Sequence, residues 1–193
     1  MDKYSGLLHP ISTFIPSGVP QHWADLGCGT GVFTRILAQY LPESSKITAI
    51  DKVPQYFPET IENSVNIDFK VGDFNSEPLP LQQLDGIMMA NSLHYIRNKE
   101  AFILQTEKYF AKNPAFLIIE YNRTKANQWV PYPIPFEQLK ALFSRLNYTH
   151  IEKIGEQNSL YGGVMYACYV RKEVDWKICH IHVIGVINRK IAS

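Results

Sequence analysis

A glycine-rich loop is the strongest chemical signal in the sequence. Residues 25–31 read Asp-Leu-Gly-Cys-Gly-Thr-Gly, and a helical pattern begins directly after them at Val32. Glycines lack Cβ atoms, so the backbone here can turn tightly and come close to a ligand. The loop leads into a helix N-terminus, whose N–H groups and partial positive charge favour an anionic group such as a carboxylate. The acid that precedes the glycines, Asp25, favours a ligand that also carries a cation.

The spacing of these glycines differs from the dinucleotide-binding fingerprint. G-x-G-x-x-G would place its third glycine at position 32, where Val32 stands, and the third glycine here is Gly31. Asp25 would also repel a pyrophosphate. The loop therefore disfavours a nicotinamide-dependent oxidoreductase, which stays as an alternative. A ligand with an ammonium, a sulfonium and a carboxylate fits better, and S-adenosylmethionine has this combination.

The stretch from Trp23 to Gly31 resembles motif I of the class I (Rossmann-like) S-adenosylmethionine-dependent methyltransferases. The similarity covers about residues 23–170 and implies S-adenosylmethionine as the cofactor and S-adenosylhomocysteine as the product. It also implies that Asp51, 20 residues beyond Gly31, accepts hydrogen bonds from both ribose hydroxyls. One carboxylate matches two neighbouring donors.

Two further segments correspond to cofactor-lining positions of that family. Asp73 and Phe74 follow the third expected strand, where the resemblance implies an acid for the adenine amino group and an apolar neighbour for the ring. Residues 90–95 follow the fourth expected strand and are similar to the segment that lines the methionine end. The candidate cofactor-binding residues are Asp25, Gly27, Cys28, Gly29, Gly31, Asp51, Lys52, Asp73, Phe74 and Asn91.

Each of these positions also has a structural interpretation that the sequence leaves open. The glycines can form a plain strand-to-helix turn, and Asp51 can be a solvated carboxylate at a strand end. Asp73 can shape a turn after Gly72, and Phe74 can belong to the core. For Cys28 we favour packing beneath the loop over a nucleophilic role.

The absence of two known motifs narrows the class of molecule that could accept the methyl group. Residues 91–94 (Asn-Ser-Leu-His) do not match the Asn/Asp-Pro-Pro-Tyr loop used for amino-methylation of DNA adenine. None of the three cysteines stands in a context suited to attack on cytosine. The leading prediction is therefore a small-molecule acceptor, methylated on oxygen, nitrogen or carbon. A non-catalytic S-adenosylmethionine-binding module and a protein or RNA methyltransferase remain as alternatives.

His94 is a weak candidate for a catalytic base, because imidazole titrates near neutrality and this histidine follows a strand expected beside the cofactor. Packing or hydrogen bonding to its own loop is the favoured alternative. The proline-rich loop 122–135 follows the fifth expected strand and is predicted to face the acceptor. Its candidate polar contacts are Asn122, Arg123 and Gln128. The candidate aromatic contacts are Tyr121, Trp129, Tyr132 and Phe136, of which the last three alternatively pack the loop onto the domain.

The elements that must position these residues alternate between β-branched runs and helical patterns, which is typical of βαβ units. The expected strands are 23–26, 46–51, 67–71, 84–90, 115–121, 149–154 and 164–170. The expected helices are 32–41, 54–63, 98–111 and 136–146. No helix separates the last two strands, so they should form an antiparallel hairpin at one edge. We therefore predict a three-layer α/β/α sandwich with a mostly parallel seven-stranded sheet, the Rossmann-like methyltransferase fold.

Composition agrees with one folded domain: the chain has 193 residues, of which 46% are hydrophobic and 19% charged. The formal net charge of +1 offers no broad basic surface to a nucleic acid or an anionic membrane. No apolar run is long enough to cross a bilayer. The unpaired cysteines and the lack of a leader pattern predict a cytoplasmic protein. No metal site is predicted, because a fourth ligand is missing beside Cys179, His180 and His182.

The chain divides into three expected parts. Residues 1–22 are expected to cover the cofactor, and residues 23–171 form the S-adenosylmethionine-binding domain. Residues 172–193 extend beyond the last expected strand and are predicted to add an edge strand or to form a homodimer contact. The candidate covering side chains are Tyr4, His9 and Phe14.

Overall fold

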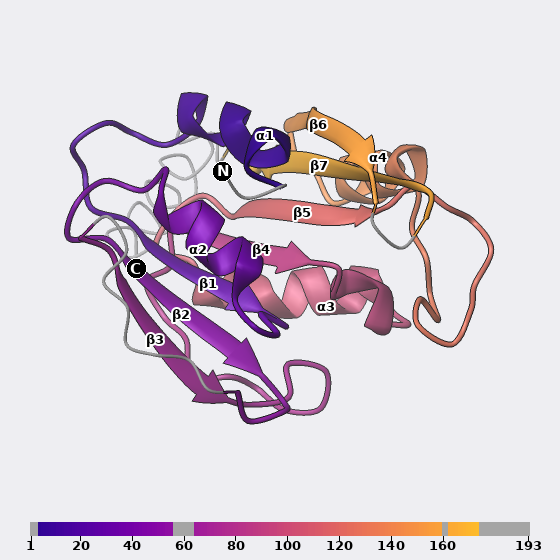
Figure 1. The fold of residues 1–193 in the computed structure, drawn as a ribbon, viewed down its shortest axis with the longest axis horizontal. Helices are drawn as coiled ribbons and strands as arrows, with labels where there is room; N and C mark the ends of the chain where they lie inside the picture. The colour runs from indigo at the N-terminus through magenta and orange to yellow at the C-terminus, as the bar shows by residue number, and fades with distance from the viewer. Residues whose placement is uncertain (1–3, 56–63, 160–161, 174–193) are drawn as a thin grey trace, which may run out of the picture.

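A computed structural model of the chain describes residues 4–55, 64–159 and 162–173 (Figure 1). These residues form a seven-stranded sheet in the order β3-β2-β1-β4-β5-β7-β6. The first five strands are parallel, and β7 runs antiparallel to both β5 and β6. This arrangement confirms the predicted sheet and its antiparallel edge hairpin. The strands are β1 (His22–Leu26), β2 (Lys46–Asp51), β3 (Asn66–Val71), β4 (Gly86–Ala90), β5 (Ala115–Tyr121), β6 (His150–Asn158) and β7 (Val164–Arg171).

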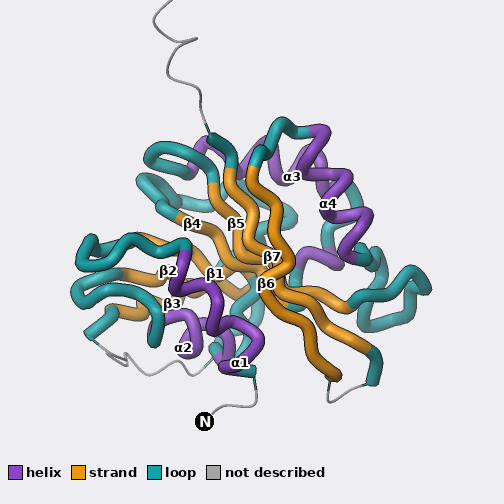
Figure 2. The backbone as a smooth tube through the Cα atoms, turned by 90° about the horizontal axis from the view of Figure 1, so that it is seen from above, coloured by secondary structure: helices purple, strands orange, loops and turns teal. Residues whose placement is uncertain are grey.

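Helices cover both faces of the sheet and complete the three predicted layers. Figure 2 shows α1 and α2 on one side of the strands and α3 and α4 on the other. No helix in the described ranges is long and apolar enough to cross a membrane. The α-helices are α1 (Ser5–Leu8), α2 (Val32–Ala38), α3 (Lys99–Thr106) and α4 (Phe136–Arg145). The 3-10 helices are η1 (His9–Thr13), η2 (Leu93–Tyr95) and η3 (Glu107–Tyr109).

Two helices end earlier than the apolar pattern predicted. After Ala38 the chain tightens, and the N–H of Gln39 donates to the carbonyl of Ile36, as in a 3-10 turn. Helix α3 gives way to η3 because Phe110 must be extended to pair with Leu84. Both ends are set by contacts that helical periodicity does not encode. The helix predicted over 54–63 falls mainly on residues 56–63, outside the described residues.

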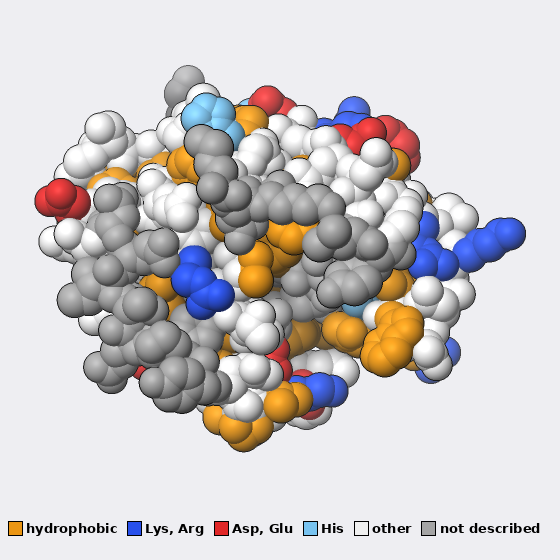
Figure 3. All heavy atoms as spheres, viewed as in Figure 1, with side chains coloured by type: hydrophobic (Ala, Val, Ile, Leu, Met, Phe, Trp, Pro, Cys, Tyr) orange, Lys and Arg blue, Asp and Glu red, His pale blue; other side chains and the backbone are white. Residues whose placement is uncertain are grey.

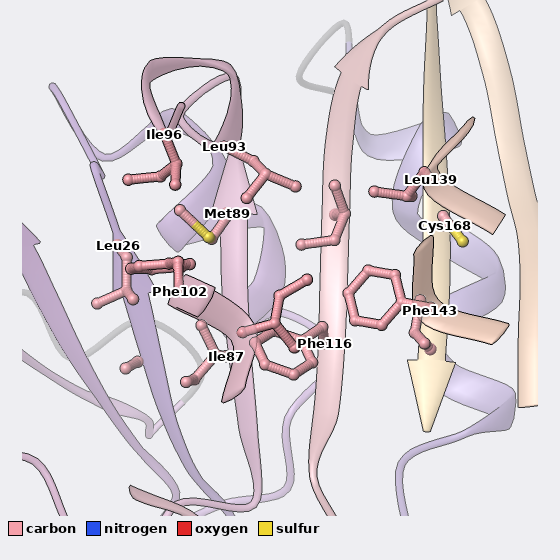
Figure 4. Close-up of a cluster of buried hydrophobic side chains, with 14 of the residues drawn as sticks. Leu26, Ile87, Met89, Leu93, Ile96, Phe102, Phe116, Leu139, Phe143 and Cys168 are labelled. Atoms are coloured by element: carbon pink, nitrogen blue, oxygen red, sulfur yellow. The ribbon is translucent and has the colours of Figure 1, made fainter. Parts of the chain in front are cut away.

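The alternation of side chains along the strands divides the core into two clusters, one on each face of the sheet. On β1, Ala24 and Leu26 join the cluster under α3 and α4, whereas Trp23 faces the cluster under α1 and α2. Phe116, the second residue of β5, is fully buried, and the centre of its ring lies 5.5 Å from that of Phe143 on α4 (Figure 4). Both faces are therefore apolar, which is why the central strands read as continuous hydrophobic runs.

The N-terminal segment packs on the sheet face beside α2 and β6. Phe14 stacks on Tyr169 and approaches His150, the first residue of β6, while His9 contacts Tyr40 beyond the end of α2. These positions lie toward the amino ends of the strands, opposite the glycine loop. His9 and Phe14 therefore lie away from the glycine loop that they were expected to cover. Tyr4 lies nearer that loop, with its ring 5.2 Å from Phe33 in the first turn of α2.

The sheet topology determines where a site can form. Strand order turns back at β1, which pairs with β2 on one side and with β4 on the other. Open α/β sheets bind ligands outside the carboxyl ends of their strands, at this switch point. The glycine loop follows β1, and the segment 91–95 follows β4. The fold therefore brings together the two segments that the sequence associated with the cofactor.

We expect Phe116→Ala to lower the free energy of unfolding by about 3–5 kcal/mol, because it leaves a cavity among aromatic rings that cannot collapse fully. Leu104→Ala is the matched control, since Leu104 is 50% exposed on α3 and its truncation should change stability by less than about 0.5 kcal/mol. Urea denaturation of both variants measures the difference. Equal losses would contradict the assignment of Phe116 to the centre of the core.

Candidate functional site

The glycine loop at the carboxyl end of β1 is bound to the end of β2. The N–H groups of Gly27 and Cys28 both donate to the Ile50 carbonyl, at 2.8 and 3.1 Å. The N–H of Gly29 donates to Oδ2 of Asp51 at 2.9 Å. These three donors hold the loop in place and do not stand free for a ligand. The loop glycines all have left-handed φ angles, which L-residues rarely adopt: 82° at Gly27, 50° at Gly29 and 77° at Gly31.

Gly27 is also required by a close approach. A Cβ atom at this position would lie 2.5 Å from Cβ of Ser92 and 3.2 Å from the ring of Phe74. Ser92 is itself fixed, because its hydroxyl donates to the carbonyl of Leu26 at 2.5 Å. The glycine loop and the segment after β4 therefore touch at Gly27. A Cβ added above Gly29 would meet nothing within 4 Å, so that side of the loop is open.

A cavity of about 280 Å³ lies between the ends of β1, β2, β3 and β4, and we call it the Asp51 cavity. Six of the ten predicted cofactor residues line it: Gly27, Asp51, Lys52, Asp73, Phe74 and Asn91. Three lining residues were not predicted as such: Asn75, Ser92 and Tyr95. The other four predicted residues are absent from this lining: Asp25, Cys28, Gly29 and Gly31.

Both carboxylates in the Asp51 cavity already accept hydrogen bonds from the chain. Asp51 accepts from the N–H of Val53 through Oδ1, at 3.0 Å, besides its bond from Gly29. Asp73 accepts from the N–H of Asn75 at 3.0 Å and from the Ser76 hydroxyl at 2.8 Å. Each carboxylate oxygen has a second lone pair, so both groups keep capacity for a donor on a ligand. Asp73 thus stabilises the turn after β3, as considered from the sequence, and it also lines the Asp51 cavity.

Asn91 contributes an unsatisfied acceptor to the cavity wall. Its side-chain Oδ1 is buried and has no hydrogen-bond partner among the described residues. Its backbone is held at a φ of 55° by a hydrogen bond from its N–H to the carbonyl of Ile119. A buried acceptor without a donor costs free energy unless a ligand supplies one. This orphan and the two carboxylates fit S-adenosylmethionine, whose ammonium, amino and ribose hydroxyl groups are all donors.

Asp25 is buried behind the glycine loop and does not line the Asp51 cavity. One carboxylate oxygen, Oδ2, accepts from the Thr34 hydroxyl on α2 at 2.6 Å, and Oδ1 has no partner among the described residues. Burial raises the pKa of Asp25 from 3.8 to about 7, against the effect of the Thr34 hydrogen bond. In this position Asp25 links β1 to α2 across the loop.

Cys28 packs against the core cluster under α1 and α2, as favoured from the sequence. Burial raises the pKa of its thiol, and the charges of Asp25 and Asp51 raise it further. The thiolate, which is the nucleophilic form, is therefore disfavoured at neutral pH. This environment agrees with the packing role.

A second cavity, of about 520 Å³, lies beside the first, and we call it the His94 cavity. It shares Asn91 and Tyr95 with the Asp51 cavity. The other lining residues come from η2, the end of β5, the loop 122–135 and Gly162: His94, Tyr121, Arg123, Asn127, Trp129, Val130 and Gly162. At the right of Figure 3, Lys and Arg side chains over the loop 122–135 stand beside exposed hydrophobic ones.

Of the four aromatic residues predicted at and after the end of β5, two line the His94 cavity and two do not. Tyr121 and Trp129 line the His94 cavity, and Trp129 is 70% exposed, so it does not pack the loop onto the domain. Tyr132 is absent from this lining. Its N–H donates to the carbonyl of His94 at 3.0 Å, and its own carbonyl accepts from Lys99 at 2.7 Å. Tyr132 therefore tethers the loop beside His94.

His94 is buried and paired with a carboxylate that the sequence analysis did not single out. Its Nδ1 lies 2.8 Å from Oε2 of Glu120, and its backbone N–H donates to Oε1 at 3.0 Å. The N–H of Tyr121 donates to Oε2 at 3.3 Å. The available signal was the single charged residue in the apolar run 115–121, because a charge on a buried strand needs partners. His94 therefore both pairs with a carboxylate and lines a cavity, so packing is not its only contact.

Substitution of Asp25 by Asn tests its environment through the pH dependence of stability. A carboxyl with a raised pKa binds a proton in the folded state that the unfolded state releases, so stability falls as the pH rises from about 4 to 7 and stays low above 7. Asn keeps an acceptor for Thr34 without this charge. As the pH rises from 5 to 8, we expect the free energy of unfolding of wild type to fall by about 2 kcal/mol relative to that of Asp25→Asn.

Urea denaturation at both pH values measures this difference. Asp68→Asn is the control, because Asp68 is an exposed carboxylate of β3 that pairs with Lys46 and Lys70. A difference between wild type and Asp25→Asn that is the same at both pH values would contradict the raised pKa.

Comparison with known proteins agrees with this geometry. Residues 21–177 match a protein-family model described as a methyltransferase domain. Carboxy-S-adenosyl-L-methionine synthase from Dichelobacter nodosus is 31% identical over 100 residues, which are 48% of this chain and 41% of that protein. The match thus spans less than half the length of that relative.

Solved structures with the same fold have low sequence identity. A SAM-dependent methyltransferase from Aquifex aeolicus aligns with a TM-score of 0.60 and 16% identity, over 90% of this chain and 94% of that one. The 1,6-didemethyltoxoflavin-N1-methyltransferase of Burkholderia thailandensis, solved with 1,6-didemethyltoxoflavin and S-adenosylhomocysteine bound, aligns with a TM-score of 0.63 and 17% identity. That alignment covers 90% of this chain and 80% of the other. These likenesses establish the fold.

The family match over residues 21–177 covers most of the 193 residues. It includes the glycine loop, all seven strands and the residues that line both cavities. The chain belongs to the methyltransferase-domain family, with the class I Rossmann-like fold.

Proposed function

We propose that this protein transfers a methyl group from S-adenosylmethionine to an oxygen, nitrogen or carbon of a small-molecule acceptor. The observation that carries the proposal is the pair of adjoining cavities that share Asn91 and Tyr95. One contains the carboxylates suited to a nucleoside, and the other has an aromatic wall suited to a second molecule. Two molecules bound there would meet at Asn91.

The residues of the Asp51 cavity have distinct roles toward the cofactor. Asp51 would accept from the ribose hydroxyls, Asp73 from the adenine amino group, and Phe74 would lie against the adenine ring. The orphan Oδ1 of Asn91 would accept a donor at the boundary with the His94 cavity. When bound, S-adenosylmethionine supplies an electrophilic methyl group on a positively charged sulfur. The protein mainly has to align the acceptor with that methyl group and exclude water.

The His94 cavity favours a small molecule over a macromolecular acceptor. Its volume of about 520 Å³ is in the range of small-molecule sites, and Trp129, Tyr121 and Tyr95 give it apolar walls. The net charge of +1 provides no broad basic surface for RNA. A protein or RNA acceptor is therefore the weaker alternative.

Binding of S-adenosylhomocysteine by Asp51 variants tests the proposal. We expect the ligand to raise the melting temperature of the wild-type protein, because it binds only the folded state. Asp51→Ala should weaken this binding by about 1–3 kcal/mol, or about 5- to 150-fold in Kd, the scale of charge-assisted hydrogen bonds. Isothermal titration calorimetry measures both affinities.

Asp68→Asn serves again as the control, because it removes a carboxylate of the neighbouring strand that lies outside the Asp51 cavity. Its affinity should equal that of wild type. An unchanged affinity of Asp51→Ala would contradict the ribose assignment, and no binding by wild type would reject the proposed function. Binding without turnover of any acceptor would favour a non-catalytic module.

A further inference from the structure

The His94 cavity holds a charge arrangement that narrows the acceptor class, and the inference drawn from it rests on the proposed function. The ionisable groups of its lining are His94, Arg123 and two tyrosines, and the described lining contains no carboxylate. The carboxylate of Glu120 lies behind His94 and is fully buried. A ligand in this cavity therefore meets cationic and neutral groups.

Glu120 fixes both the orientation and the proton position of His94. The carboxylate accepts from the backbone N–H groups of His94 and Tyr121, so it is held rigidly on β5. Its Oε2 faces Nδ1 of the imidazole at 2.8 Å. A carboxylate only accepts, so the proton of the neutral ring resides on Nδ1. The second nitrogen, Nε2, is then an unprotonated acceptor directed away from Glu120.

Arg123 provides a positive charge at the same cavity. It lies two residues beyond the end of β5, is half-buried and lines the cavity with His94. No carboxylate of the described residues forms an ion pair with its guanidinium. A half-buried guanidinium without an anionic partner favours a carboxylate or phosphate on the ligand, which it can bind through two parallel hydrogen bonds.

The aromatic walls favour a flat molecule between His94 and Arg123. The rings of His94 and Tyr95 are 4.4 Å apart, and those of His94 and Tyr121 are 6.4 Å apart. Trp129, 70% exposed, stands at the loop side of the cavity, where a ligand would cover it. Such walls bind a planar ring through large apolar contact.

We propose that the acceptor is a planar, anionic molecule whose methylated atom is a protonated oxygen or nitrogen, with His94 as the general base, Glu120 as its positioning residue and Arg123 as the anion contact. The acceptor's O–H or N–H bond breaks, and its proton forms an N–H bond at Nε2 of His94. A lone pair of that oxygen or nitrogen forms the bond to the methyl carbon, and the pair of the broken O–H or N–H bond stays on the same atom. The pair of the broken carbon–sulfur bond stays on sulfur. The imidazolium, stabilised by Glu120, later releases its proton to water.

The proton position on His94 is a test that does not need turnover. We expect ¹⁵N NMR of the neutral imidazole in the wild-type protein to show a protonated Nδ1 and an unprotonated Nε2. In Glu120→Gln, which keeps the size of the side chain, the population of this tautomer should fall because an amide replaces the charged acceptor. A proton on Nε2 in the wild-type protein would overturn the base assignment.

Anion recognition is tested by binding to protein saturated with S-adenosylhomocysteine. The probes are hydroxy- and amino-substituted benzoic, naphthoic and indole carboxylic acids, each paired with its methyl ester. Calorimetry should show at least about tenfold tighter binding for acids that fit than for their esters, the scale of one charge-assisted hydrogen bond. Arg123→Met should abolish this difference. Lys125→Met should retain it, because Lys125 is a cation of the same loop outside the His94 cavity.

For the acids that are methylated, His94→Asn should lower kcat by about 10²- to 10⁴-fold, the contribution typical of a general base. The Asn side chain can still donate to Glu120, so the loop should keep its fold. Arg123→Met should mainly raise KM. A wild-type kcat in His94→Asn, or acids that bind no better than their esters while S-adenosylhomocysteine still binds, would overturn this proposal alone. Failure of S-adenosylhomocysteine to bind would instead reject the proposed function.

Discussion

The hydrogen bonds between the glycine loop and the end of β2 are the constraint on which the site depends. Two loop N–H groups share the carbonyl of Ile50, and the next donates to Asp51. The same carboxylate that faces the Asp51 cavity therefore also holds the loop after β1. A loop with left-handed glycines would otherwise have many conformations, and each bond to β2 removes some of them. The loop and the carboxylate are positioned as one unit.

Close packing extends this unit to the strand beyond. There is no space for a side chain at position 27, because Ser92 lies against Gly27. The hydroxyl of Ser92 in turn donates a hydrogen bond to the end of β1. The segments after β1, β2 and β4 are therefore interlocked at one point of the sheet edge. The two cavities lie on either side of Asn91, which has a left-handed backbone and a buried side-chain oxygen without a partner among the described residues.

Charge is distributed unequally between the two cavities. Carboxylates line the Asp51 cavity, whereas the described lining of the His94 cavity contains a histidine and an arginine. The acid that accompanies the histidine is kept behind it, where three donors of the chain satisfy it. A buried carboxylate is tolerated only with such partners. Membership of the methyltransferase-domain family accounts for the fold. The charges that line each cavity are a local property, and they influence which acceptor molecule can bind.

The sequence by itself determined the order of elements and the identity of the cofactor edge. Apolar runs and helical spacing give the sheet, and the glycines with Asp51 and Asp73 mark the ends of three strands, because these are local patterns. Helix ends were less well predicted, since pairing between Phe110 and Leu84 overrides periodicity. Only the tertiary structure showed which N–H groups of the loop are already used and that Glu120 stands behind His94. These residues are 26 positions apart, and their contact depends on the alignment of β4 with β5, which no local pattern encodes.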